Sequence, residues 1–93
     1  MSGKPSDVAK RVIEFLNKKT GKAFQPTATN LKFIIERMKE GYGEDMFRMV
    51  IARKIRDWKT DPKMVGYLRP ATLFNCEKFN QYAGECAPTD LRP

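Results

Sequence analysis

The feature that most constrains the fold of this chain is a helical spacing of apolar residues between positions 43 and 59. Apolar side chains recur there every three or four residues, which gathers them on one face of a helix. The residues on this face are Phe47, Val50, Ile51, Ile55 and Trp58. No stretch of the sequence alternates apolar and polar residues for long enough to predict a strand. The spacing therefore predicts an all-α protein with a helix from Gly43 to about Trp58 or Lys59.

Two earlier segments show the same spacing, and each ends at a glycine. The first covers about residues 7–20, with Ser6 as its candidate N-cap. The second covers about residues 30–40, and either Thr29 or Thr27 is placed to cap it. Glycine after a helix adopts the left-handed backbone conformation that closes the last turn. We therefore expect a bundle of three main helices that pack their apolar faces together.

The last third of the chain is less regular, because Pro62 and Pro70 disfavour helical backbone in the residues before them. Asn75 is a candidate cap for a final helix near residues 76–82, so we expect short helical segments that close one side of the core. The expected core residues are Val12, Leu16, Ile34, Ile35, Phe47, Ile51, Ile55, Trp58, Leu68, Leu73, Phe74 and Phe79. The expected organisation is a flexible N-terminus at 1–5, one helical domain at 6–83 and a flexible tail at 84–93.

Length and residue types argue against several protein classes. No apolar run approaches the ~20 residues that a membrane-spanning helix needs, and the first residues lack the apolar segment of a signal peptide. Two cysteines, Cys76 and Cys86, are too few for a disulfide scaffold, and the chain has no histidine to complete a zinc site. We therefore expect a cytoplasmic protein with free thiols, no metal and no membrane contact. A Cys76–Cys86 bridge stays open as the alternative.

The missing histidines also argue against an enzyme. Without histidine, neither a Ser/His/Asp nor a Cys/His arrangement can form, and the sequence has no glycine-rich phosphate loop. The adjacent acids Glu44 and Asp45 point in different directions on a helix, and acids at a helix start favour its dipole. We therefore expect a binding protein with no catalytic residue and no cofactor.

Positive charge is the main functional signal in the composition. The chain has 18 Lys and Arg against 11 Asp and Glu, a formal net charge of +7. Basic residues crowd the first and the third predicted helix. A field of this sign attracts nucleic acid and accelerates encounter with it. The alternative interpretation is a solvated face that keeps a small protein soluble.

Several motifs resemble one family of phage proteins. They are IEFLN (Ile13–Asn17), TGKAF (Thr20–Phe24), IIERMKEGYG (Ile34–Gly43), YLRP (Tyr67–Pro70), TLF (Thr72–Phe74) and KFNQY (Lys78–Tyr82). Together they resemble the conserved C-terminal domain of phage and prophage replication proteins. In that family the domain follows a replisome-organiser or winged-helix module, in an arrangement similar to DnaD-like initiation proteins. The resemblance implies a role in phage DNA replication inside the bacterial host, for an excised domain or a complete short protein.

The basic helices and this resemblance together predict sequence-independent binding to DNA, in single-stranded or forked form. The candidate DNA-binding residues are Lys18, Lys19, Lys22, Arg48, Arg53, Lys54, Arg56, Lys59 and Arg69. The alternative is an adaptor or decoy that binds the host replicative helicase or helicase loader through the same basic faces. Tyr42, Met49 and Tyr67 are candidate stacking or partner contacts, and one exposed patch of all three would favour this alternative. The oligomeric state stays open.

Overall fold

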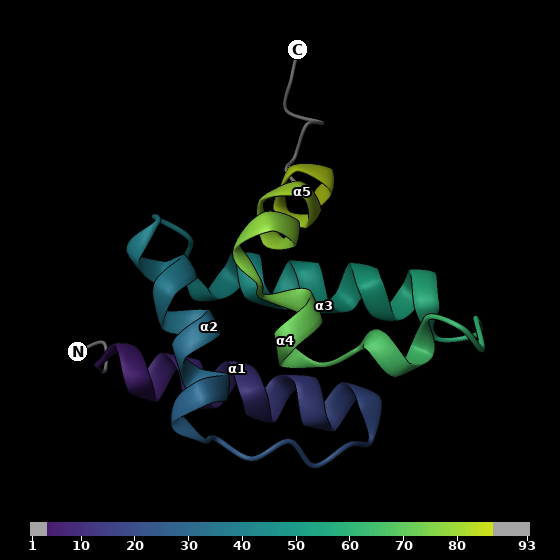
Figure 1. Ribbon diagram of the computed structural model, residues 1–93, viewed down its shortest axis with the longest axis horizontal. Helices are drawn as coiled ribbons and strands as arrows, with labels where there is room; N and C mark the ends of the chain where they lie inside the picture. Colours follow the sequence, from purple (N-terminus) through teal and green to yellow (C-terminus); the bar gives the residue numbers. More distant parts are fainter. Residues whose placement is uncertain (1–3, 87–93) are drawn as a thin grey trace.

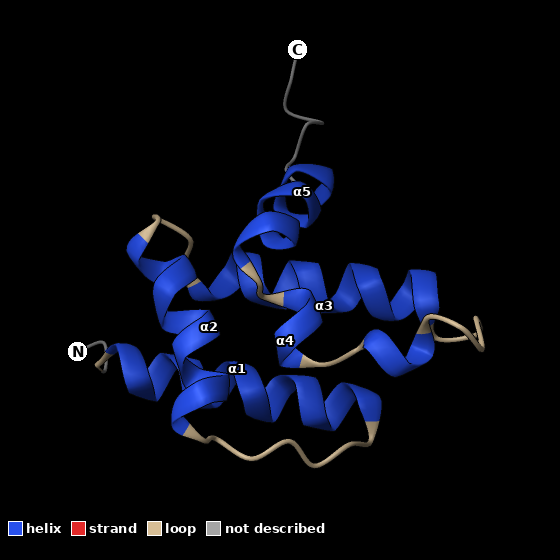
Figure 2. Cartoon of the chain, viewed as in Figure 1, coloured by secondary structure: helices blue, strands red, loops and turns tan. Residues whose placement is uncertain are grey.

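Helices are the only regular elements in residues 4–86, the part of the chain that the computed structural model describes (Figure 2). In chain order they are α1 (Pro5–Thr20), α2 (Ala28–Lys39), α3 (Glu44–Trp58), the 3₁₀ turn η1 (Val65–Tyr67), α4 (Pro70–Leu73) and α5 (Cys76–Cys86). The three expected main helices are α1, α2 and α3, and shorter segments follow them. The predicted all-α fold is therefore confirmed.

α3 lies between α1 and α5. α1 packs against α2 and α3, and α5 packs against α3 on the side away from α1 (Figure 1). The short helix α4 contacts α2 and α5. In the view of Figure 1, η1 lies with the C-terminal ends of α1 and α3, whereas the turn between α2 and α3 lies at the opposite end of the molecule. This arrangement separates the two connections that carry candidate aromatic contacts.

Two helix starts differ from the simplest expectation. Lys4 is the N-cap of α1, and Pro5 takes the first helical position, where its missing N–H costs no hydrogen bond. The expected cap Ser6 therefore lies inside the helix. Of the two candidate caps of α2, Thr27 is the one used, because its Oγ1 accepts the backbone N–H of Asn30 at 3.2 Å.

The final helix is longer than the sequence indicates. α5 continues past its expected end and includes residues 84–86, which we expected in the tail. The expected flexible ends at 1–3 and 87–93 lie outside the described residues. Cys76 and Cys86 begin and end α5, so about 15 Å of helix separates them and a bridge between them is excluded in this fold. Both are free cysteines.

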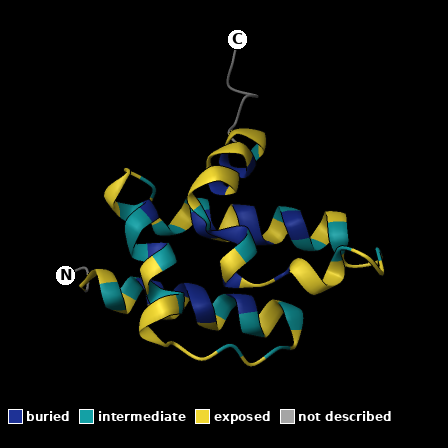
Figure 3. Ribbon diagram, viewed as in Figure 1, coloured by how far each residue is buried: buried dark blue, intermediate teal, exposed yellow. Residues whose placement is uncertain are grey.

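Three aromatic side chains fill the centre of the core. Phe47, Phe74 and Phe79 are fully buried, with ring centroids 4.9–6.0 Å apart. The colouring of Figure 3 shows buried residues in α1, α3 and α5. The buried apolar residues are Ala9, Val12, Ile13, Leu16, Ile34, Phe47, Val50, Ile51, Leu68, Leu73, Phe74, Phe79, Tyr82 and Ala83. Ile35, Ile55 and Trp58, which we expected in the core, are only partly buried and pack at its margin. Each lies on the apolar stripe of its helix, at an edge that the other described residues cover only in part.

Candidate nucleic-acid interface

Exposed cations lie in the last turn of α1, on α3 and directly after α3. Lys18 and Lys19 are exposed in the last turn of α1. Arg48 and Arg56 are exposed on α3, two helical turns apart, and Lys59 follows directly after that helix. The side chain of Arg56 is 70% exposed. These five predicted site residues are all available to solvent.

A hollow of about 210 Å³ lies between α1 and α3. Its lining residues are Arg11, Glu14, Phe15, Lys18 and Arg48. The guanidinium carbon of Arg48 lies 4.8 Å from the ring centroid of Phe15, and Lys19 Nζ lies 5.5 Å from it. Cations beside an aromatic ring are the combination that binds nucleic-acid strands without regard to sequence.

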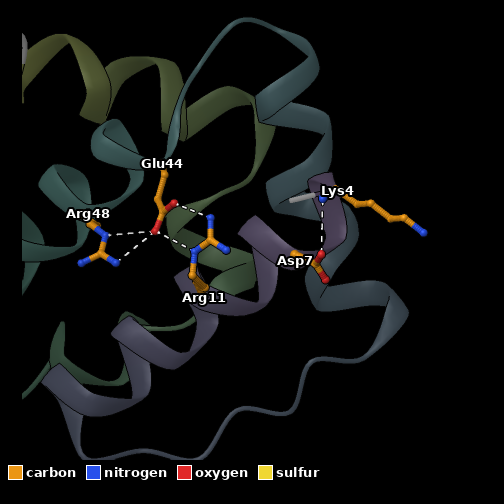
Figure 4. A network of polar contacts seen from close by, with 5 residues as sticks. All are labelled: Lys4, Asp7, Arg11, Glu44 and Arg48. Atoms are coloured by element: carbon orange, nitrogen blue, oxygen red, sulfur yellow. Dashed lines mark hydrogen bonds and ion pairs between the residues drawn. The ribbon is translucent and has the colours of Figure 1, made fainter. Parts of the chain in front are cut away.

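Glu44 joins the two helices by accepting hydrogen bonds from two arginines (Figure 4). Arg11 Nη2 donates to Glu44 Oε1 at 2.9 Å, and Arg11 Nε donates to Oε2 at 3.3 Å. Arg48 Nη2 donates to Glu44 Oε2 at 3.0 Å. In the same view, the backbone N–H of Lys4 donates to Asp7 Oδ2 at 3.4 Å, at the start of α1.

Around this hollow, three cations, Arg11, Lys18 and Arg48, outnumber the two carboxylates of Glu14 and Glu44, so this part of the surface is positive. The hydrogen bond from Arg11, and then that from Arg48, lowers the pKa of Glu44. The hydrogen bond between Arg11 and Glu44 also raises the pKa of Arg11. Glu44 therefore stays charged at neutral pH, and two guanidinium groups share its carboxylate. Glu44 holds both arginines in place without cancelling their charge.

Lys54 is placed inside the fold. It is only 5% exposed, and its Nζ donates to Glu85 Oε1 at 2.8 Å and lies 3.8 Å from Asp57 Oδ2. The same Nζ lies 4.2 Å from the ring centroid of Tyr82 and 5.3 Å from that of Trp58. We therefore remove Lys54 from the candidate interface, because its charge is already enclosed by two carboxylates and two rings.

Arg53 is partly engaged, at the edge of a second hollow of about 410 Å³ between α3 and α5. The residues around this hollow are Met49, Ala52, Arg53, Arg56 and Cys86. Arg53 Nη1 donates to the backbone oxygen of Glu85 at 3.2 Å, and its Nε lies 3.6 Å from Asp57 Oδ2. Burial raises the pKa of Cys86, which keeps this thiol protonated and poorly nucleophilic at neutral pH. The hollow therefore presents cations and a methionine, without a reactive group.

A third basic group lies where the C-terminal end of α1 meets η1. Lys22 Nζ donates to the backbone oxygens of Val65 and Leu68 at 3.3 and 3.4 Å. The guanidinium carbon of Arg69 lies 5.3 Å from the ring centroid of Tyr67. Lys22 is half-buried, whereas Arg69 is exposed. The structure therefore brings Lys22 and Arg69, both predicted site residues, to the same edge of the molecule. The hydrogen bonds to Val65 and Leu68 hold Lys22 there.

The three candidate contact residues do not form one patch. Tyr42, between α2 and α3, donates its hydroxyl to Asn80 Oδ1 and packs edge-on against Phe79 at 4.8 Å. Met49, 41% exposed, borders the hollow between α3 and α5, and Tyr67, 43% exposed, lies in η1. The connections that carry Tyr42 and Tyr67 are at opposite ends of Figure 1. The patch that would favour the protein-binding alternative is absent among these residues.

Two residues join the interface that the sequence prediction left out. Arg11 and Phe15 line the hollow between α1 and α3 beside predicted residues. Their spacing was a usable signal, since Arg11, Phe15 and Lys18 or Lys19 recur at helical intervals along one side of α1. Phe15 borders the apolar stripe of α1, because it is partly buried against the core.

Within residues 4–86, no helix is long and apolar enough to cross a bilayer, and no three potential metal-ligating side chains gather together. The family model described as "Conserved phage C-terminus (Phg_2220_C)" matches residues 12–84. No curated protein and no solved structure matches the chain.

Proposed function

This chain belongs to the Conserved phage C-terminus family, and on that premise we propose that it is a non-catalytic DNA-replication module of a phage. Its proposed activity is sequence-independent binding of single-stranded or forked DNA. In this proposal, the module works as part of a replisome-organiser or DnaD-like initiation protein. The observation that carries it is the number of exposed cations on α1, on α3 and directly after α3, which are Arg11, Lys18, Lys19, Arg48, Arg56 and Lys59. Arg11, Lys18 and Arg48 lie around one hollow between the two helices.

The physical basis is the release of counterions from the phosphate backbone. Lys and Arg side chains that contact phosphates displace condensed cations, so binding weakens steeply as salt rises. Contacts of this kind carry no sequence information. Because the arginines around Glu44 are held in place, they lose little side-chain freedom when they meet a phosphate.

We expect the protein to bind labelled oligo-dT, with a salt dependence that reflects the number of phosphate contacts. With about four to six phosphate contacts, the slope of log K against log salt should be about −0.7 for each contact. The double variants Lys18→Ala/Lys19→Ala and Arg56→Ala/Lys59→Ala should each weaken binding on every sequence and make the slope shallower by about 1.4. Fluorescence anisotropy over a series of salt concentrations measures both quantities.

The matched control removes the same charge from α2. Lys32→Ala/Lys39→Ala lowers the net charge equally but alters a helix outside the proposed interface. It should leave the slope close to that of the unchanged protein. Equal losses in the control and in the α1 or α3 variants would contradict a defined interface, and absence of binding at low salt would contradict the proposal.

The second candidate is an adaptor or decoy for the host replicative helicase or helicase loader. The observation in its favour is the hollow that exposed Met49 borders beside Arg53 and Arg56, since methionine and arginine are common in protein interfaces. Capture of a helicase or loader from a nuclease-treated lysate, lost in Met49→Ala, would favour this function. Because Tyr42, Met49 and Tyr67 do not form one exposed patch, we keep DNA binding as the first candidate function.

A further inference from the structure

The segment Tyr67–Pro70 presents an aromatic ring and a guanidinium on one side of the chain. Tyr67 and Arg69 are exposed, whereas Leu68 and Pro70 between and after them are buried. Leu68, with φ of −79° and ψ of 74°, forms a tight turn between them, and the guanidinium carbon of Arg69 lies 5.3 Å from the ring centroid of Tyr67. The buried pair anchors the segment in the core, and the exposed pair faces solvent together.

This edge is held in place before any ligand arrives. The backbone N–H of Tyr67 donates to Met64 O at 2.8 Å, and that of Arg69 donates to Tyr67 O at 2.8 Å. Lys22 ties the end of α1 to the same segment through the carbonyls of Val65 and Leu68. An aromatic ring on a segment fixed in this way loses little freedom on binding, which favours affinity.

The charge around the ring is positive and available. Arg69 uses its Nε to donate to Thr72 Oγ1 at 3.0 Å, and its two terminal nitrogens have no partner among the described residues. Two of the three Lys22 ammonium protons are used by the carbonyls, which leaves one. The nearest acid in the chain before η1, Asp61, uses Oδ1 to accept the backbone N–H groups of Lys63 and Met64. Within residues 4–86, no carboxylate pairs with Lys22 or Arg69.

We propose that the Tyr67–Arg69 pair is a stacking platform for an unpaired nucleobase, with Arg69 and Lys22 contacting the phosphates beside it. The inference rests on the proposed DNA-binding function and specifies that the ligand is single-stranded DNA. Bases in a duplex are stacked on each other and cannot lie against a protein ring, whereas unpaired bases can. The exposed apolar side chain of Val65, in the same turn, extends the surface that a base or sugar would cover.

The test compares oligo-dT with an abasic strand of equal length and equal charge. The unchanged protein should bind oligo-dT at least about fivefold more tightly than the abasic strand, because only oligo-dT has bases to stack. Tyr67→Ala should bind both strands with the same affinity, and its salt slope should stay unchanged, since the lost ring is neutral. Tyr67→Phe should keep the preference. The matched control is Phe33→Ala, which removes a partly exposed ring from α2, outside the proposed interface, and should also keep the preference.

The outcomes separate this inference from the proposed function. Salt-dependent binding to both strands with no preference for bases, or a preference that survives in Tyr67→Ala, would overturn the platform and leave DNA binding standing. No binding to either strand at low salt would overturn both. An equal loss on both strands in Tyr67→Ala would also overturn it, and circular dichroism of each variant excludes unfolding as the cause.

Discussion

Single charged residues on the same helix have different roles because of their neighbours. Arg48 and Lys54 are both on α3, but Arg48 lies against Phe15 at the surface, whereas Lys54 is enclosed by α5. Burial of a cation requires a partner charge, and Glu85 supplies it. The value of a basic residue as a DNA contact is therefore set by what packs over it.

The stabilising role of Glu44 can be tested by varying the pH. Its pKa is lowered in the folded protein, so its stabilising effect is present above the ordinary glutamate value and is lost as pH falls through the folded pKa. We expect Glu44→Gln to be less stable than the unchanged protein at neutral pH. The difference in free energy of unfolding should shrink as pH falls below the ordinary pKa of glutamate and through the lowered pKa of Glu44. Urea denaturation at several pH values measures it.

Asp45→Asn is the control for this prediction. Asp45 lies in the same first turn of α3, but no ion pair involving it is present among residues 4–86. Its substitution should change stability less than Glu44→Gln does. An unchanging difference between Glu44→Gln and the unchanged protein from pH 7 to 3 would contradict the role assigned to Glu44.

At the scale of the elements, the helix ends depend on local backbone geometry. Gly21 ends α1 with a φ of 76°, and its N–H donates to Asn17 O at 2.8 Å. Gly43 precedes α3 with a φ of −100°, which any residue adopts. The two glycines therefore occupy helix ends for different reasons.

One substitution made at both positions separates these reasons. We expect Gly21→Ser to lower the free energy of unfolding by about 1 kcal/mol, because a side chain disfavours the left-handed conformation. Gly43→Ser should be neutral or stabilising, because serine is a good N-cap and the site has no side-chain cap. Neither position has a heavy atom within 4 Å of an added Cβ, so steric overlap does not enter. Equal thermal midpoints for the two variants would contradict this account.

At the scale of the whole molecule, the core is centred on Phe47, Phe74 and Phe79 and thins toward the end of α3. Trp58 lies at that margin, with its ring edge-on to Tyr82 at a centroid distance of 6.0 Å. It is therefore a packing residue with one side open to solvent. This position lies far along α3 from the fully buried Phe47.

The partial burial of Trp58 has a measurable consequence. We expect Trp58→Ala to cost about 2 kcal/mol, since part of the ring is already in contact with water. Phe47→Ala, which empties the centre of the core, should cost about 3–5 kcal/mol. Urea denaturation followed by circular dichroism compares the two. Equal losses would place Trp58 in the central core, and an unchanged midpoint in Trp58→Ala would remove it from the packing altogether.

The candidate site was predictable where local spacing decides exposure. Lys18, Arg56 and Lys59 lie off the apolar stripes and are exposed, and Lys19, at the end of the stripe of α1, is exposed as well. The pairing of Lys54 with Glu85 was not predictable, because 31 residues separate them in the chain. The contact of Lys22 with Val65 and Leu68 is likewise long-range, so the basic edge at η1 emerges only when α1 and η1 meet.

The sequence by itself determined the helices, their approximate ends and most of the core, because these follow from side-chain spacing and from the backbone preferences of glycine and proline. Tertiary structure decided the length of α5, the partial exposure of Trp58 and the burial of Lys54. These depend on which helix covers which face. A helix has only one apolar stripe, but its margins become buried or exposed according to the neighbour that packs there, and α5 covers Lys54 while leaving Trp58 partly open.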